Sequence, residues 1–136
     1  MPPQPSPYLQ TAVYTMNPLE LTHALLKRLG RDLRGTRQAF LDEDREAAVQ
    51  HTDHALRVLG ELMQSCVLDA PEKPAREIAS RHFSLFHFWM GEVTQWHGIR
   101  EDEERDERAE KVIRQVKQLE EGYHDAVQTH RVASVS

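Results

Sequence analysis

The chain has 136 residues and a mass of 15.8 kDa, which is enough for one domain with a single core and too little for two. Charged residues make up 29% of the sequence and hydrophobic residues 39%, so a chain that is disordered over its whole length is excluded. The net charge of −5, with arginines scattered among acidic residues, argues against a nucleic-acid-binding surface, which would need a basic stripe.

Cysteine usage and the N-terminal sequence bear on the compartment. Cys66 is the only cysteine, which excludes an intrachain disulfide and a zinc site built on several thiolates and favours a reducing compartment. The first residues, MPPQPSPYLQ, lack the charged and apolar regions of a secretory signal, and no apolar run is long enough to span a membrane. We therefore predict a cytoplasmic protein without stable membrane insertion.

The N-terminal segment, residues 1–16, is expected to be a flexible arm. Four of the seven prolines fall in its first seven residues, and proline cannot continue a helix. The apolar residues Tyr8, Leu9, Val13 and Tyr14 follow directly. They either fold back over the domain or serve as a docking motif for a partner.

A first helix is predicted from Pro18 to about Phe40. Asn17 is a good N-cap, Pro18 fits the first helical position, and Glu20 stands where a capping box needs an acid. Apolar residues then recur in steps of three and four, as in a bundle: Leu26, Leu29, Leu33, Thr36 and Phe40, flanked by Leu21 and Leu25. Gly30 and Gly35 weaken this helix by about 1 kcal/mol each relative to alanine, so it depends on tertiary packing.

A second helix, capped by Asp42 or Asp44, is predicted to run to about Leu68. Its apolar positions again step by three and four: His51, Ala55, Val58 and Leu62. The segment Asp69 to Pro74 should end it, because its two prolines are hard to keep inside a helix.

The segment from Glu77 to His97 is predicted to be a third helix with an unusually wide apolar surface. One helical stripe consists of Ile78, His82, Leu85, Trp89, Val93 and Trp96. A second stripe lies beside it, consisting of Ala79, Phe83, Phe86 and Met90. Either the whole face is buried in the core, or one stripe packs internally and the other binds a partner, as in helix-in-groove recognition.

Residues 100–108 alternate in charge and contain no apolar residue, which indicates a solvated loop or a fraying first turn held by local ion pairs. The last helix has the most regular pattern, with apolar or aromatic residues in steps of three and four: Ala109, Val112, Val116, Leu119, Tyr123, Ala126 and His130. Residues 131–136 are expected to form a disordered tail.

Four helices of similar length with short connections predict an all-α fold, an antiparallel up-down-up-down four-helix bundle spanning residues 17–130 with a flexible N-terminal arm. No internal repeat and no strand pattern is present in the sequence.

Eight histidines raise the possibility of a metal site. His51 and His54 share a helix face, but His82 and His87 are five residues apart and diverge by about 140°. Phosphate-binding glycine loops and nucleophile motifs are missing from the sequence. We therefore expect no enzyme, no catalytic residue, no cofactor and no metal ligand. A histidine-ligated metal enzyme of bundle type is the alternative.

Four short motifs in the predicted helices resemble the flagellar export chaperone FliS family, of which the chain looks like a divergent member. They are Asn17 to Leu21 in the first helix, Ala55 with Val58, Leu59, Glu61 and Leu62 in the second, Ile78 and Ala79 with Leu85, Phe86, Phe88 and Trp89 in the third, and Val112, Ile113, Val116, Leu119 and Tyr123 in the last. Phenylalanines replace the tyrosines of the third-helix motif, and His97 stands where the family usually has asparagine.

The resemblance implies a non-enzymatic cytoplasmic chaperone for flagellar type III secretion, which binds the disordered C-terminal region of flagellin and prevents premature polymerisation. It also implies that the N-terminal arm covers part of the binding groove and contacts the flagellar export gate. An adaptor with the same fold and another cargo is a further alternative. On this basis the predicted partner-binding residues are Tyr8, Leu9, Ala79, Phe83, Phe86 and Met90.

Overall fold

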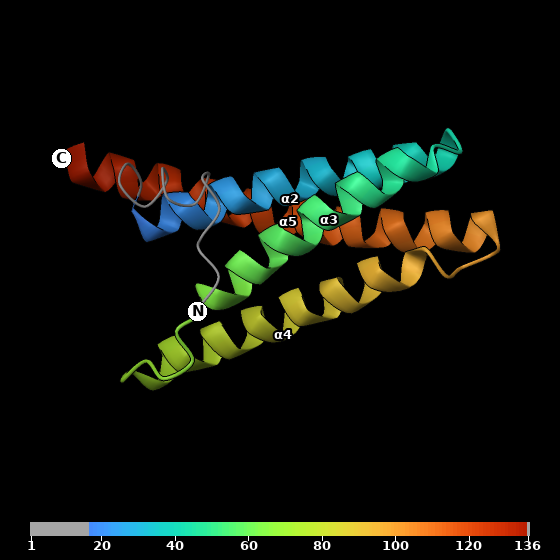
Figure 1. Cartoon of the computed structure of the whole chain (residues 1–136). Coiled ribbons are helices and arrows are strands. Elements are labelled where there is room, and N and C mark those ends of the chain that lie inside the picture. Colours follow the sequence, from blue (N-terminus) through green and yellow to red (C-terminus); the bar gives the residue numbers. More distant parts are fainter. Residues whose placement is uncertain (1–16, 136) are drawn as a thin grey trace, which may run out of the picture.

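A computed structural model describes residues 17–135, which form four helices (Figure 1). They are α2 (Pro18–Leu41), α3 (Arg45–Gln64), α4 (Lys73–Trp96) and α5 (Asp102–Val135). Consecutive helices run in opposite directions, so the predicted all-α antiparallel bundle is confirmed. The predicted N-terminal arm, residues 1–16, lies outside the described residues.

Side-chain caps fix the starts of the first two helices. The Asn17 side chain accepts a hydrogen bond from the Glu20 amide at 2.8 Å, and Pro18 occupies the first turn of α2, as predicted. Asp44, rather than Asp42, caps α3, accepting from the Ala47 amide at 3.1 Å. The connecting turn is tight because Glu43 adopts a left-handed backbone conformation with φ of 56°.

Two predicted helix boundaries are wrong. Helix α3 ends at Gln64, four residues before Leu68, and α4 begins at Lys73 instead of Glu77. Pro74 therefore belongs to the first turn of α4, where a missing N–H leaves no hydrogen bond unmade.

Of the two alternatives predicted for residues 100–108, the solvated loop is wrong from Asp102 onward. These residues form the first two turns of α5, with Asp102, Glu103 and Glu104 at its N-terminus, where the helix dipole favours acidic side chains. Some of the charges do pair locally, as Arg105 does with Asp102 at 2.9 Å. At the other end α5 continues to Val135, through most of the residues expected to be a disordered tail, and with 34 residues it is much longer than the other helices.

The core is organised around α2, which packs against both α3 and α5. Its leucines at positions 25, 26, 29 and 33 are fully buried. Ala55, Leu59 and Leu62 of α3 and Val112 and Val116 of α5 surround them. Helix α4 completes the core with Phe86, Trp89, Val93 and Trp96, packing on α3 and α5.

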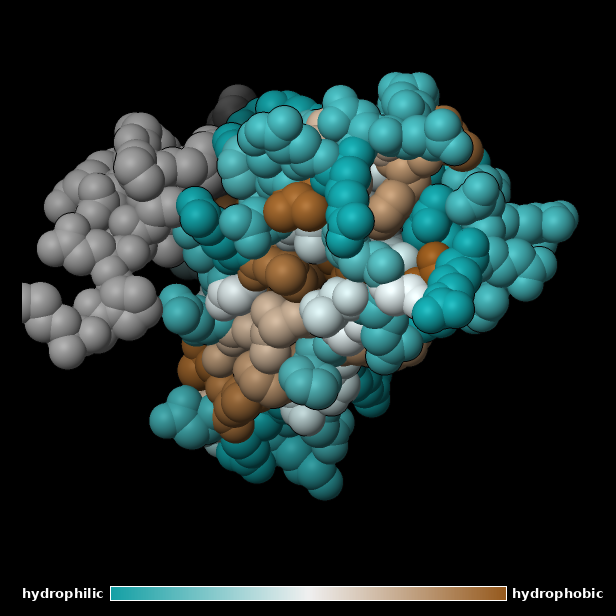
Figure 2. Space-filling view, turned by 45° about the vertical axis from the view of Figure 1, so that its right-hand side comes forward, coloured by the Kyte–Doolittle hydropathy of each residue, from teal (hydrophilic) through white to brown (hydrophobic). Residues whose placement is uncertain are grey.

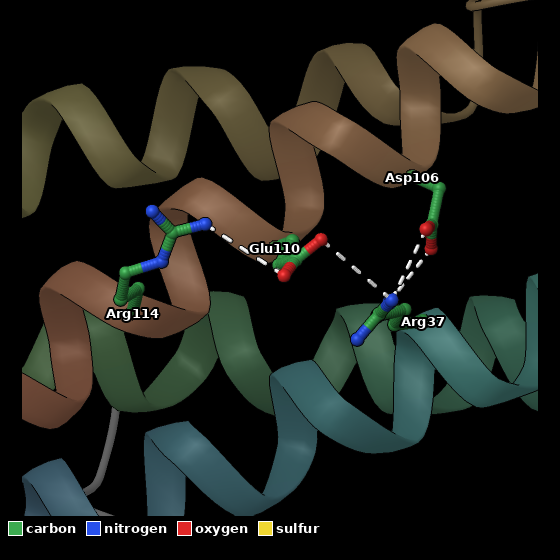
Figure 3. A network of polar contacts seen from close by, with 4 residues as sticks. All are labelled: Arg37, Asp106, Glu110 and Arg114. Carbon is green, nitrogen blue, oxygen red and sulfur yellow. Dashed lines mark hydrogen bonds and ion pairs between the residues drawn. The ribbon is translucent and has the colours of Figure 1, made fainter.

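Polar contacts between helices fix their register. Arg37 of α2 binds the Asp106 carboxylate of α5 through two nitrogens, at 2.7 and 3.1 Å (Figure 3). This pairing lowers the pKa of Asp106 and raises that of Arg37. The buried Trp89 indole donates to Gln115 of α5 at 2.9 Å, so it is not left unpaired in the core.

Asp32 is an acidic residue whose side chain is buried in the bundle, where a charged carboxylate is unfavourable. It is only 5% exposed, and one carboxylate oxygen has no hydrogen-bond partner. Arg28 Nε lies 3.8 Å away, but burial is the dominant effect and raises the pKa of the Asp32 carboxyl.

Replacing Asp32 with asparagine should therefore stabilise the protein by about 1 kcal/mol at pH 7. At pH values above the raised pKa of Asp32 in the folded protein, the ionised carboxylate destabilises the fold, so the stabilisation by asparagine should be complete. This stabilisation should disappear as the pH falls below the lower pKa that Asp32 has in the unfolded chain. Urea unfolding at pH 7 and pH 3 measures this, with the exposed Asp53→Asn as control. Destabilisation by Asp32→Asn at pH 7 would contradict the assignment.

Glycines in the helices differ in the space around them. A Cβ at Gly35 would lie 2.5 to 2.8 Å from three ring atoms of His51, whereas a Cβ at Gly60 meets nothing within 4 Å. The first glycine permits close approach of α2 and α3, and the second only weakens α3.

Gly60→Ala should accordingly raise the free energy of unfolding by about 0.5 to 1 kcal/mol, and Gly35→Ala should lower it. The double variant Gly35→Ala, His51→Ala should recover part of the loss, because it removes the ring that the new methyl group meets. Equal effects of the two single variants in thermal and urea unfolding would rule out the proposed clash.

Candidate functional site

The helices separate most at the end where α2 and α4 begin and α3 and α5 end (Figure 1). A groove of about 320 Å³ opens there, which we call the α4 groove. One wall comes from the first half of α4: Ala75, Ile78, Ala79, His82 and Phe86. The facing wall comes from the segment after α3, with Ser65, Cys66, Val67 and Ala70, and is completed by Thr22 of α2 and Tyr123 of α5.

Polar groups inside the α4 groove are held in their neutral forms. Tyr123 Oη lies 3.1 Å from His82 Nδ1, within hydrogen-bond distance. Burial lowers the pKa of His82 and raises the pKa values of Cys66 and Tyr123, the last with a smaller contribution from Cys66. The groove is therefore an uncharged surface at neutral pH, suited to apolar rather than ionic ligands.

Exposed apolar side chains border the groove. Ile78 is 53% exposed and Val67 58%, and Leu68 next to Val67 is exposed as well. Figure 2 shows apolar colour across the centre and the lower left of the visible face. Apolar surface that continues from a groove onto its edges is typical of protein-binding sites.

The structure brings together only some of the predicted partner-binding residues. Ala79 and Phe86 line the α4 groove. Phe83 is partly buried but is not among the residues that line the groove. Met90 is partly buried against the core. Tyr8 and Leu9 lie outside the described residues.

The second apolar stripe of α4 faces α3, which covers Phe86 and partly covers Ala79, Phe83 and Met90. Met90 and His97 are seven residues apart and so lie on the same side of the helix. Thr52 of α3 contacts His97 Nε2 at 2.8 Å on that side. Phe86 is only 1% exposed, so it is primarily a core residue whose edge reaches the groove.

Periodicity misplaced Ile78 of this helix and did not place Phe88. Ile78 shares the helical stripe of Trp89 and Trp96, yet it is exposed because α4 diverges from its neighbours in its first turns. Phe88 is 48% exposed, on the side of α4 where Glu92 pairs with Arg108 of α5. Val67 and Leu68, assigned to α3 by their sequence pattern, were missed because they lie in the loop that follows it.

The histidines are spread over the bundle. His51 packs against Gly35, His54 and His87 are exposed, and His82 and His97 contact Tyr123 and Thr52. Within residues 17–135, no group of three or more His, Cys, Asp or Glu side chains is arranged to hold a metal ion. In the same part of the chain, no helix is long and apolar enough to cross a membrane.

Comparison with known proteins gives one family match. The family model described as "Flagellar protein FliS" matches residues 1–130. Neither the curated proteins nor the solved structures contain a match to this chain.

The burial of Phe86 and the exposure of Phe88 predict different costs of truncation. Phe86→Ala should lower the free energy of unfolding by about 3 kcal/mol, because it leaves a cavity in the core. Phe88→Ala should change it by less than about 0.5 kcal/mol, since its side chain is half in solvent. Urea denaturation measures both, and similar small effects would place Phe86 outside the core.

Proposed function

The chain belongs to the FliS family of flagellar export chaperones, and from this premise we propose that its client is flagellin, bound through the disordered C-terminal region. We further propose that the α4 groove holds one amphipathic helix of this client. The main support is the uncharged groove with exposed Ile78 and Val67 at its edges.

The contacts available suit an apolar helical segment. An amphipathic helix places apolar residues at every third or fourth position, and these can enter a groove while the polar face stays in water. Burying the exposed parts of Ile78, Val67 and Leu68 would contribute about 1 kcal/mol each, given that their side chains are roughly half covered already. Ordering the client costs several kcal/mol, so this groove can supply only part of the binding surface.

Such binding would keep the client export-competent. A flagellin segment held in the groove cannot use the same apolar residues to associate with other subunits, which prevents premature polymerisation. The cost of ordering the segment limits the affinity and permits release. We propose that this occurs in the cytoplasm, that Tyr8 and Leu9 of the N-terminal arm contribute to the site, and that the arm contacts the export gate.

The core position of Phe86 makes it a poor probe of binding, because its substitution would disturb folding. Ile78 and Phe88 form a better matched pair. Both are large apolar residues of α4 that are about half exposed, but Ile78 borders the groove and Phe88 lies on the side toward Glu92.

A fluorescently labelled peptide from the C-terminal region of flagellin should bind the full chain, as measured by anisotropy. Ile78→Asp and Val67→Asp should each weaken binding at least tenfold, because a carboxylate would have to be desolvated against the peptide. Phe88→Asp should change it less than twofold. Circular dichroism and thermal unfolding should show that all three variants remain folded.

Two failures are distinguishable. If the wild-type chain does not bind the peptide, flagellin is not the client, and an adaptor with another cargo is favoured. If the wild-type chain binds but Ile78→Asp and Val67→Asp bind equally well, the client occupies a different surface.

A further inference from the structure

A second groove, of about 530 Å³, lies between α2 and α5. Leu26 and Gly30 of α2 and Ile113 and Val116 of α5 form its apolar floor. A Cβ at Gly30 would lie 3.8 Å from Val116 and only 3.2 Å from Arg34 Nη1, so the absent side chain lets this guanidinium lie close over the helix. We call this site the α2–α5 groove.

The rim of the α2–α5 groove is basic although the chain carries a net charge of −5. Lys27, Arg31 and Arg34 line it from α2, and Lys117 lines it from α5. The one acid in the lining, Glu120, has its Oε1 2.7 Å from His23 Nε2. Among the described residues, none of the four cations has a carboxylate within 4.0 Å.

The four cations of the rim lie between two places where side chains of α2 and α5 pair with each other. The contact of His23 with Glu120 lies at one end, and the network of Arg37 with Asp106 and Glu110 lies at the other (Figure 3). The α2 residues between these contacts extend over about 21 Å, from a rise of about 1.5 Å per residue. Polar side chains of α2 and α5 therefore contact each other at both ends of the groove. Between these contacts the cations of the rim have no acidic partner within the described part of the chain, and the surface there is also apolar.

We propose that the α2–α5 groove docks an acidic amphipathic helix of a partner protein. The apolar stripe of such a helix would cover the floor, and Asp or Glu residues flanking the stripe would pair with Lys27, Arg31 and Arg34 on one side and with Lys117 on the other. The α2 residues that line the groove, from Leu26 to Arg34, extend over about 12 Å, or roughly two helical turns.

A peptide helix fits this groove better than a nucleic acid does. A phosphate backbone would pair with the rim but leave the apolar floor unused, and most of its charge would face a protein of net negative charge. The inference does not depend on flagellin or on the α4 groove, because the two sites differ in position and charge.

The test uses a labelled helical peptide of about five turns, with an apolar stripe at every third or fourth residue and glutamates on both flanks. One control peptide carries lysines in place of the glutamates, and another has the apolar residues scrambled. The full chain should bind the acidic peptide selectively, and binding should weaken as salt rises from low to physiological concentration, because the rim charges are exposed.

Charge reversal of the rim, Lys27→Glu with Lys117→Glu, should weaken binding at least tenfold. Arg57→Glu is the matched control, since Arg57 is an exposed cation of α3 that forms no ion pair with another described residue. It should bind within twofold of the wild type, as should Ile78→Asp.

Three results would overturn the proposal: absence of binding by the wild-type chain, equal binding after charge reversal of the rim, or equal binding of the scrambled peptide. A single-stranded oligonucleotide that displaces the acidic peptide from the wild-type chain, but does not bind the rim variant, would assign the groove to nucleic acid instead.

Discussion

Burial of the α2 leucines between α3 and α5 is the constraint on which the rest of the fold depends. Leu25, Leu26, Leu29 and Leu33 lose all contact with solvent, and burial of each contributes about 1.5 to 3 kcal/mol. Because α2 carries apolar residues toward both neighbours, it needs a helix on each side. Helix α4 then closes the remaining side of the core through the second half of its length, with Trp89, Val93 and Trp96.

This arrangement divides α4 into two parts with different roles. Its second half is tied to both neighbours by Trp89 to Gln115, Glu92 to Arg108 and His97 to Thr52. Its first half diverges from these neighbours. The contact between His82 and Tyr123 links this half to α5. The α4 groove is a direct consequence, since the apolar residues of the diverging turns have no helix close enough to cover them.

The two grooves differ in what surrounds their apolar surfaces. Burial favours the neutral forms of His82, Cys66 and Tyr123 in the α4 groove, so the binding proposed there would depend on shape and apolar contact. Lys27, Arg31, Arg34 and Lys117 surround the α2–α5 groove, so charge adds selectivity there. A bundle of this size thus presents two grooves of different chemistry while its core stays closed.

The sequence by itself determined the fold class, the cap at Asn17, the apolar stripes of the helices and the resemblance to the FliS family. These features are local or periodic, so they are visible in one segment at a time. Only the tertiary structure decided that Phe86 is core, that Ile78 is exposed and that residues 102–108 are helical. Periodicity gives the direction of a side chain around its helix, but exposure depends on how far the neighbouring helix lies. The unpaired cations of the α2–α5 groove were likewise invisible in the sequence, because their pairing depends on residues of another helix some ninety positions away.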